Sequence, residues 1–124
     1  METNQIWNHE NSECWKKARD LTIKIHRLST HINSESDRSL QKALRKSSLS
    51  IMTQITLGNE HDNPQESIKY LGYAKASLAA FRTYLIILRE FGYLSEADYL
   101  DFEDRIIHIA VLLGRLIQFK SPKK

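Results

Sequence analysis

Residues 63–92 read NPQESIKYLGYAKASLAAFRTYLIILREFG, and this stretch decides the fold class. Its first four residues combine a capping asparagine, a proline at the first helical position and a glutamate that can complete a capping box. No helix breaker follows until Gly92, which is placed to end the helix in the left-handed conformation. The pattern therefore predicts one helix over 64–91, about 28 residues or roughly 42 Å long.

Helical spacing also covers the chain on both sides of this stretch. A helix over 12–32 is predicted from one apolar stripe, made by Trp15, Ala18, Leu21, Ile25, Leu28 and Ile32. A helix over 37–57 has Leu40, Leu44, Ile51 and Ile55 on its inner face, and Gly58 stands where a left-handed cap would end it. Ser95 and the acids that follow it predict the start of a helix over 95–119.

Composition supports an all-α protein. The chain has 124 residues, 41% of them hydrophobic, with only four glycines and two prolines. This length suffices for one core, so we expect a single domain over 1–124 with flexible ends at 1–11 and 120–124. Because the connections are short, neighbouring helices should be antiparallel. The sequence predicts an antiparallel up-down-up-down four-helix bundle.

No segment has the apolar length of a membrane span, and the polar N-terminus is unlike a secretory signal. We therefore expect a cytoplasmic protein with no membrane partner. Cys14 is the single cysteine and cannot form an internal disulfide. We interpret it as a small hydrophobic residue.

Patterns for catalysis and cofactors are absent from the sequence. It contains no Glu-x-x-His pair for a di-iron site, no zinc-site spacing of its five histidines, no glycine-rich phosphate loop and no nucleophile elbow. We expect no catalytic residue, no metal site and no cofactor. A small enzyme remains the third hypothesis, and it would need a cleft with perturbed titratable groups.

Charge is unevenly distributed, although the net charge is only +3. Five Lys/Arg stand against two acids in 12–32 and four against one in 37–58, whereas 95–117 has five acids and two Arg. Basic rows on two adjacent helices could follow a phosphate backbone, so we predict a nucleic-acid-binding face. Its candidate residues are Lys16, Lys17, Lys24, Arg27, Arg38, Lys42, Arg45 and Lys46. The alternative is an ordinary solvated face.

Two stretches, 84–88 and 106–113, are apolar nearly all round, whereas a surface helix of a monomer buries a single stripe. Placed in adjacent antiparallel helices, their outward residues would form one exposed apolar patch. We therefore predict a homo-oligomer with an interface formed by Tyr84, Ile86, Ile87, Ile107, Val111 and Leu112.

From Trp15 to Phe119 the chain resembles the bacterial four-helix-bundle proteins encoded in intervening sequences of 23S ribosomal RNA genes. The resemblance rests on four segments: Trp15-Lys16-Lys17-Ala18-Arg19-Asp20-Leu21, Leu40-Gln41-Lys42-Ala43-Leu44-Arg45-Lys46-Ser47-Ser48-Leu49-Ser50-Ile51, Ala74-Lys75-Ala76-Ser77-Leu78 and Phe91-Gly92-Tyr93-Leu94. These motifs are helix-packing patterns, which specify a fold better than an activity. Where the family usually continues Pro-Ser-Asn-Ile-Ala-Glu-Gly, this chain has residues 52–58, and only Ile55 and Gly58 keep the pattern. Arg82 replaces an acid common in the family.

That family is similar in fold to the accessory variability determinant of diversity-generating retroelements, a pentameric bundle with a basic surface. The resemblance implies a homopentamer, RNA or DNA as ligand and a reverse transcriptase as partner. Our leading hypothesis is accordingly a non-enzymatic oligomer that binds nucleic acid or a nucleoprotein. The alternative is a scaffold or protein-interaction module that binds no nucleic acid.

Overall fold

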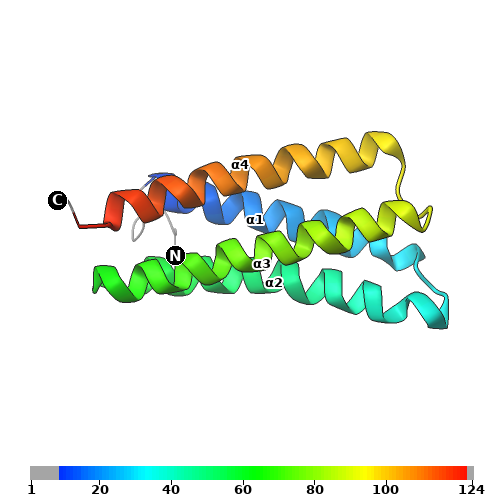
Figure 1. Ribbon diagram of the computed structural model, residues 1–124, viewed down its shortest axis with the longest axis horizontal. Coiled ribbons are helices and arrows are strands. Elements are labelled where there is room, and N and C mark those ends of the chain that lie inside the picture. The colour runs from blue at the N-terminus through cyan, green and yellow to red at the C-terminus, as the bar shows by residue number, and fades with distance from the viewer. Residues whose placement is uncertain (1–8, 123–124) are drawn as a thin grey trace.

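The computed structural model describes residues 9–122, and this part of the chain consists of four α-helices with short connections (Figure 1). The helices are α1 (His9–Leu28), α2 (Arg38–Glu60), α3 (Pro64–Glu90) and α4 (Glu96–Lys120). Successive helices run in opposite directions, and residues 9–122 contain no strand. The predicted all-α, up-down-up-down four-helix bundle is confirmed. None of these helices is both long and apolar enough to span a membrane.

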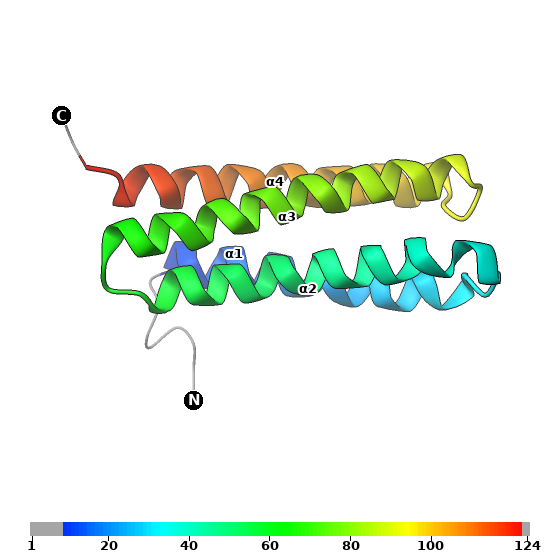
Figure 2. The same cartoon turned by 60° about the horizontal axis from the view of Figure 1, so that its bottom comes forward.

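The helices form a closed ring of neighbours. α1 packs against α2 and α4, and α3 packs against the same two helices. α2 and α4 therefore lie across the diagonal of the bundle, as Figures 1 and 2 show from two directions. The most extensive contact joins α2 to α3. Consequently the basic helix α2 and the acid-rich helix α4 face opposite sides of the molecule.

Local signals set both ends of α3, although the capping box predicted at its start does not form. The Asn63 side chain accepts hydrogen bonds from the amides of Gln65 (2.8 Å) and Glu66 (3.3 Å), and Pro64 begins the helix. Glu66 pairs with Lys69 at 3.2 Å, so the expected reciprocal bond of a capping box is replaced by an ion pair one turn on. At the other end Gly92 has φ +85° and the Tyr93 amide donates to the Leu88 carbonyl, which is a Schellman motif.

The ends of the other helices differ from the sequence prediction by a few residues. Residues 9–11 and Lys120, predicted to lie in flexible ends, are helical, whereas residues 1–8 and 123–124 lie outside the described residues. α1 ends at Leu28 and continues as a 3₁₀ turn over Ser29–His31. The tighter turn occurs where Arg45 of α2 donates to the His26 carbonyl of α1 and Gln41 donates to the Ser29 carbonyl of the turn itself.

The prediction that Gly58 caps the second helix was wrong. α2 continues through it to Glu60, and the left-handed conformation is absent there. Gly58 is buried, and the hydroxyl of Ser67 donates to its carbonyl at 2.5 Å. A Cβ built on Gly58 would lie 2.8 Å from Cγ and Cδ2 of Leu71. The glycine therefore allows α2 and α3 to approach closely beside their connection.

Gly58→Ala should lower the free energy of unfolding by about 1–2 kcal/mol. The clash is with the branch carbon of a fully buried leucine, and such overpacking costs about 1–3 kcal/mol, which exceeds the gain of about 0.5–1 kcal/mol from replacing a helical glycine. Urea denaturation measures the difference. Gly72→Ala is the matched control, because a Cβ there meets nothing within 4 Å. It should stabilise the protein, and effects of the same sign would contradict the close-approach explanation.

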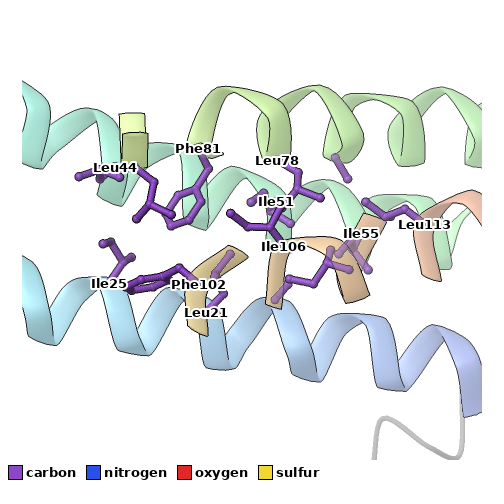
Figure 3. Close-up of a cluster of buried hydrophobic side chains, with 14 of the residues drawn as sticks. Leu21, Ile25, Leu44, Ile51, Ile55, Leu78, Phe81, Phe102, Ile106 and Leu113 are labelled. Carbon is purple, nitrogen blue, oxygen red and sulfur yellow. The ribbon is translucent and has the colours of Figure 1, made fainter. Parts of the chain in front are cut away.

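A continuous core runs along the inside of the bundle (Figure 3). Most residues of the predicted stripes are buried, while Trp15, Leu28 and Leu40 pack at its edge. Within it the rings of Phe81 and Phe102 lie 6.2 Å apart between centroids, inclined by 57°. Both side chains are fully buried, so these two aromatic residues anchor α3 and α4 to the rest of the core.

Candidate nucleic-acid interface

The outer face of α2 carries a row of exposed cations. Arg38, Lys42 and Lys46 are spaced by four residues, so they follow one side of the helix over about 12 Å. All three side chains are exposed, and none has a hydrogen-bond or ion-pair partner elsewhere in residues 9–122. Such a row is available to an external anion.

Arg45, predicted to belong to this row, turns toward α1. Its Nε donates to the Ser29 hydroxyl at 2.9 Å and a terminal nitrogen donates to the His26 carbonyl at 3.1 Å. The amide of Gln41 donates to the Ser29 carbonyl at 2.8 Å. These bonds satisfy backbone carbonyls at the C-terminal end of α1, where a cation is also favoured by the helix dipole. Arg45 thus fixes α2 against α1 and is not free for a ligand.

Lys24 points to α4. Its ammonium contacts the carboxylate of Asp101, lies 3.6 Å from that of Asp98, and lies 4.6 Å from the centroid of the Phe102 ring. Arg105 donates to the same Asp101 carboxylate at 2.8 Å. The hydrogen bonds from Arg105 and then Lys24 lower the pKa of Asp101 below its usual value. Lys24 therefore joins α1 to α4, and it is not part of a free basic row.

The remaining candidates on α1 lie far from one another. Lys16 and Lys17 are half-buried near the start of the helix, where Lys17 pairs with Glu13 at 3.7 Å. Arg27 is exposed about 16 Å further along, at the end of α1 beside which the cations of α2 begin. It lines an open cavity of about 550 Å³ together with Lys24 and Arg105. The structure thus brings Arg27 to the end of the bundle that carries Arg38 and Lys42.

The predicted apolar interface divides between separate surfaces. Ile86 follows Arg82 by one turn, and the Arg82 guanidinium reaches Glu103 of α4 through two bonds of 2.9 and 2.8 Å. Ile86 therefore lies on the α4 side of α3, where Ile107 and Val111 are exposed on α4 itself. Because Arg82 lies opposite Glu103 in this antiparallel pair, Ile86 is offset along the axis by about 12 Å from Ile107 and by about 18 Å from Val111.

Three other predicted interface residues lie elsewhere. Tyr84 and Ile87 line an open cavity with Leu40 and Ala43, so they belong to the α2 side of α3. Leu112 is partly buried against the core. Successive side chains of a helix point in different directions, so the apolar residues of 84–88 face three places. Leu85 and Leu88 lie in the core, and the others lie on two outer surfaces.

Cys14 is fully buried, and burial raises the pKa of its thiol from 9.0 to about 12. At pH 8 the thiolate should be about a thousandfold scarcer than in the unfolded chain, and alkylation of the folded protein by iodoacetamide should be slower by a similar factor. A raised thiol pKa stabilises the fold fully below pH 9 and loses that contribution as pH rises toward 12. Comparable rates in buffer and in denaturant would contradict this prediction.

Within residues 9–122, no group of three His, Cys, Asp or Glu side chains is placed to hold a metal ion. Of the predicted binding residues, Arg38, Lys42 and Lys46 form a row of exposed cations, whereas Arg45 and Lys24 are engaged by neighbouring helices. The described part of the molecule is a small antiparallel four-helix bundle whose oppositely charged helices lie on opposite sides.

The chain belongs to the 23S rRNA-intervening sequence protein family, whose model matches residues 10–115. The resemblance to this family, inferred from the sequence, is thereby confirmed. The fold also matches the crystal structure of a protein with unknown function from the S23 ribosomal protein family of Bacteroides thetaiotaomicron. That match has a TM-score of 0.81 and 18% sequence identity, and it covers 88% of this chain and 98% of that one. No curated protein matches the chain.

Proposed function

We propose that this protein is a homo-oligomeric bundle that binds the phosphate backbone of RNA or DNA through the outer face of α2. The observation that carries the proposal is the row formed by Arg38, Lys42 and Lys46, which is exposed and has no partner within residues 9–122. Arg27 adds a cation at the same end of the bundle.

The spacing of the row suits a phosphate backbone. Over about 12 Å of axis one strand of a duplex carries three to four phosphates, which three cations can contact. Arg45 holds this part of α2 against α1, so the row is presented on a fixed helix. The sequence of α2 contains no aromatic residue on which a base could stack. We therefore expect recognition of the backbone with little sequence preference.

Self-association would multiply this weak contact. Each copy contributes one row, and linked rows bind a long polyanion more tightly than a single row does. A homopentamer is the state that the resemblance to the retroelement accessory protein suggests, and a nucleoprotein containing a reverse transcriptase is the partner that the same resemblance suggests. A reverse transcriptase gene beside this one would support that context, whereas a position inside a ribosomal RNA gene would favour a role tied to the intervening sequence.

The direct test is binding of a fluorescently labelled RNA duplex across a salt series. Three phosphate contacts predict a log–log slope near −2.7 and about a fortyfold loss of affinity between about 50 and 200 mM salt. Absence of binding at about 50 mM salt, or an affinity that salt does not change, would overturn the proposal.

A scaffold without nucleic-acid binding is the second candidate. It is favoured by the placement of a basic α2 and an acidic α4 on opposite sides of the bundle. In that case Arg38→Glu together with Lys42→Glu should dissociate the oligomer, whereas a row that only binds phosphate would lose these two cations with the oligomer intact. Size-exclusion chromatography with light scattering distinguishes the two outcomes.

A further inference from the structure

A shallow groove runs along the outside of α2 and α3. Two open cavities of about 290 and 380 Å³ share Ala43 and Tyr84, so they form one continuous depression. The groove exists because small residues from both helices line it, chiefly Ala43, Ser47, Ser50, Ser77 and Ala80. The Ser50 and Ser77 hydroxyls bond each other at 2.9 Å across its floor. From Ser77 to Phe91 the groove is about 21 Å long.

The outer face of α4 carries an apolar ridge. Leu100, Ile107 and Val111 are spaced by seven and four residues, so they share one side of the helix, and they are 57, 55 and 45% exposed. The ridge spans about 16 Å. Asp104 lies between Leu100 and Ile107 on the same face and is exposed. Three aligned apolar side chains on a helix of one chain indicate a covered surface more strongly than isolated ones do.

Groove and ridge complement each other in shape, length and charge. A ridge of about 16 Å fits a groove of about 21 Å, and small side chains in the groove allow a helix to approach closely. Lys46 lines one end of the groove, and Asp37 lines the other, where it accepts from the Tyr93 hydroxyl. Asp104 stands on the ridge, 3.6 Å from the His108 ring, so Lys46 is the groove charge that it can pair with. Ile87 and Phe91, both exposed, extend the apolar surface at one end of the groove. A second copy of this chain supplies a partner with the required features.

We propose that the α4 ridge of one copy docks in the α2–α3 groove of the next. The inference rests on the proposed self-association and specifies its geometry. Since α4 lies across the diagonal from α2, a copy whose ridge is docked still presents a free groove. Such a head-to-tail contact is heterologous, and it forms a ring when the rotation between copies closes. Arg38 and Lys42 do not line the groove, so they stay available to phosphate when a ridge is docked, whereas Lys46 then faces Asp104 of the neighbouring copy.

Two variants with one damaged surface each test the geometry. Ala43→Arg fills the groove and Ile107→Asp places a charge on the ridge. Each variant alone should be monomeric by analytical ultracentrifugation. Mixed in equal amounts they should form a one-to-one heterodimer and nothing larger. The intact ridge of the Ala43→Arg variant can dock in the intact groove of the Ile107→Asp variant, and the two damaged surfaces prevent further growth. Thr53→Arg and Leu49→Asp are matched controls at exposed positions of α2 outside both surfaces, and they should assemble like the wild type.

The other outcomes are equally informative. If Ala43→Arg assembles normally while Ile107→Asp does not, the ridge meets another ridge and the head-to-tail geometry is wrong. If the mixture stays monomeric, the two surfaces are not partners. If the wild type itself is a monomer at micromolar concentration, the proposed self-association fails first. Circular dichroism melting of each variant confirms that it is folded.

A charge exchange gives an independent readout. Lys46→Glu or Asp104→Lys alone should weaken assembly by about twofold to tenfold, since charges at the rim of an interface contribute modestly. The double variant should recover most of the wild-type affinity. Additive losses in the double variant would show that these two residues do not face each other.

Discussion

Phe102→Ala is expected to lower the free energy of unfolding by about 3–5 kcal/mol, the usual cost of emptying a buried aromatic site. Phe102 is fully buried, packs against Phe81 with centroids 6.2 Å apart, and supports the Lys24 ammonium 4.6 Å from its own centroid. The substitution therefore removes contacts to α3 and to α1 together. Guanidinium denaturation followed by circular dichroism measures the loss.

Phe119→Ala is the matched control on the same helix. Phe119 is 78% exposed, so its truncation should change the free energy of unfolding by no more than about 0.5 kcal/mol. Similar losses for the two substitutions would mean that Phe102 does not anchor the core. An unchanged slope against denaturant would confirm that the two variants unfold the same structure.

The helices and their inward faces could be predicted from the sequence because both depend on local rules. The apolar period placed Leu21, Ile25, Leu44 and Ile51 in the core, and all four are fully buried. The ends of α3 were predicted well, since a capping asparagine and a left-handed glycine act within a few residues. The prediction of a cap at Gly58 was wrong because this glycine is needed for the close approach of Leu71 from another helix, which local sequence does not reveal.

The candidate basic surface was predicted less well, since long side chains find partners that sequence spacing does not reveal. Lys24 and Arg45 stood in basic rows, yet one bonds α4 and the other bonds the end of α1. The partners of both cations are in the sequence but far along the chain from them. Lys24 pairs with the acids Asp98 and Asp101, and Arg45 bonds an unsatisfied carbonyl where α1 ends. Spacing along a helix identifies a shared face, whereas the packing of neighbouring helices decides which charges remain free.

The predicted apolar interface also differs from the structure, because an apolar stretch without a polar face does not indicate which side chains are exposed. Residues 84–88 point in successive directions about 100° apart, so no periodicity indicates which of them face the solvent. Only the positions of α2 and α4 assign Ile86 to one side of α3 and Ile87 to the other. The predicted single patch therefore became two surfaces of different shape, which is the basis for the head-to-tail contact proposed above.

Arg38→Glu together with Lys42→Glu should lower affinity for the RNA duplex at least about a hundredfold at low salt. Two phosphate contacts are replaced by repulsion, and the salt slope should become shallower by about 2. Both side chains are exposed and without partners in residues 9–122, so the free energy of unfolding should change little. Arg45→Glu would be a poorer choice, because it also removes the bonds that hold the end of α1.

The control variant for this binding experiment must change the net charge by the same amount at positions away from the α2 row. Lys75→Glu with Arg115→Glu, exposed on α3 and α4, also reverses two cations and takes the net charge from +3 to −1, since each reversal subtracts 2. If position matters, this control should keep most of the affinity, whereas the α2 variant should lose it. Equal losses would show that overall charge attracts the RNA and that the row on α2 is not a binding site. Fluorescence anisotropy at matched salt separates the two results.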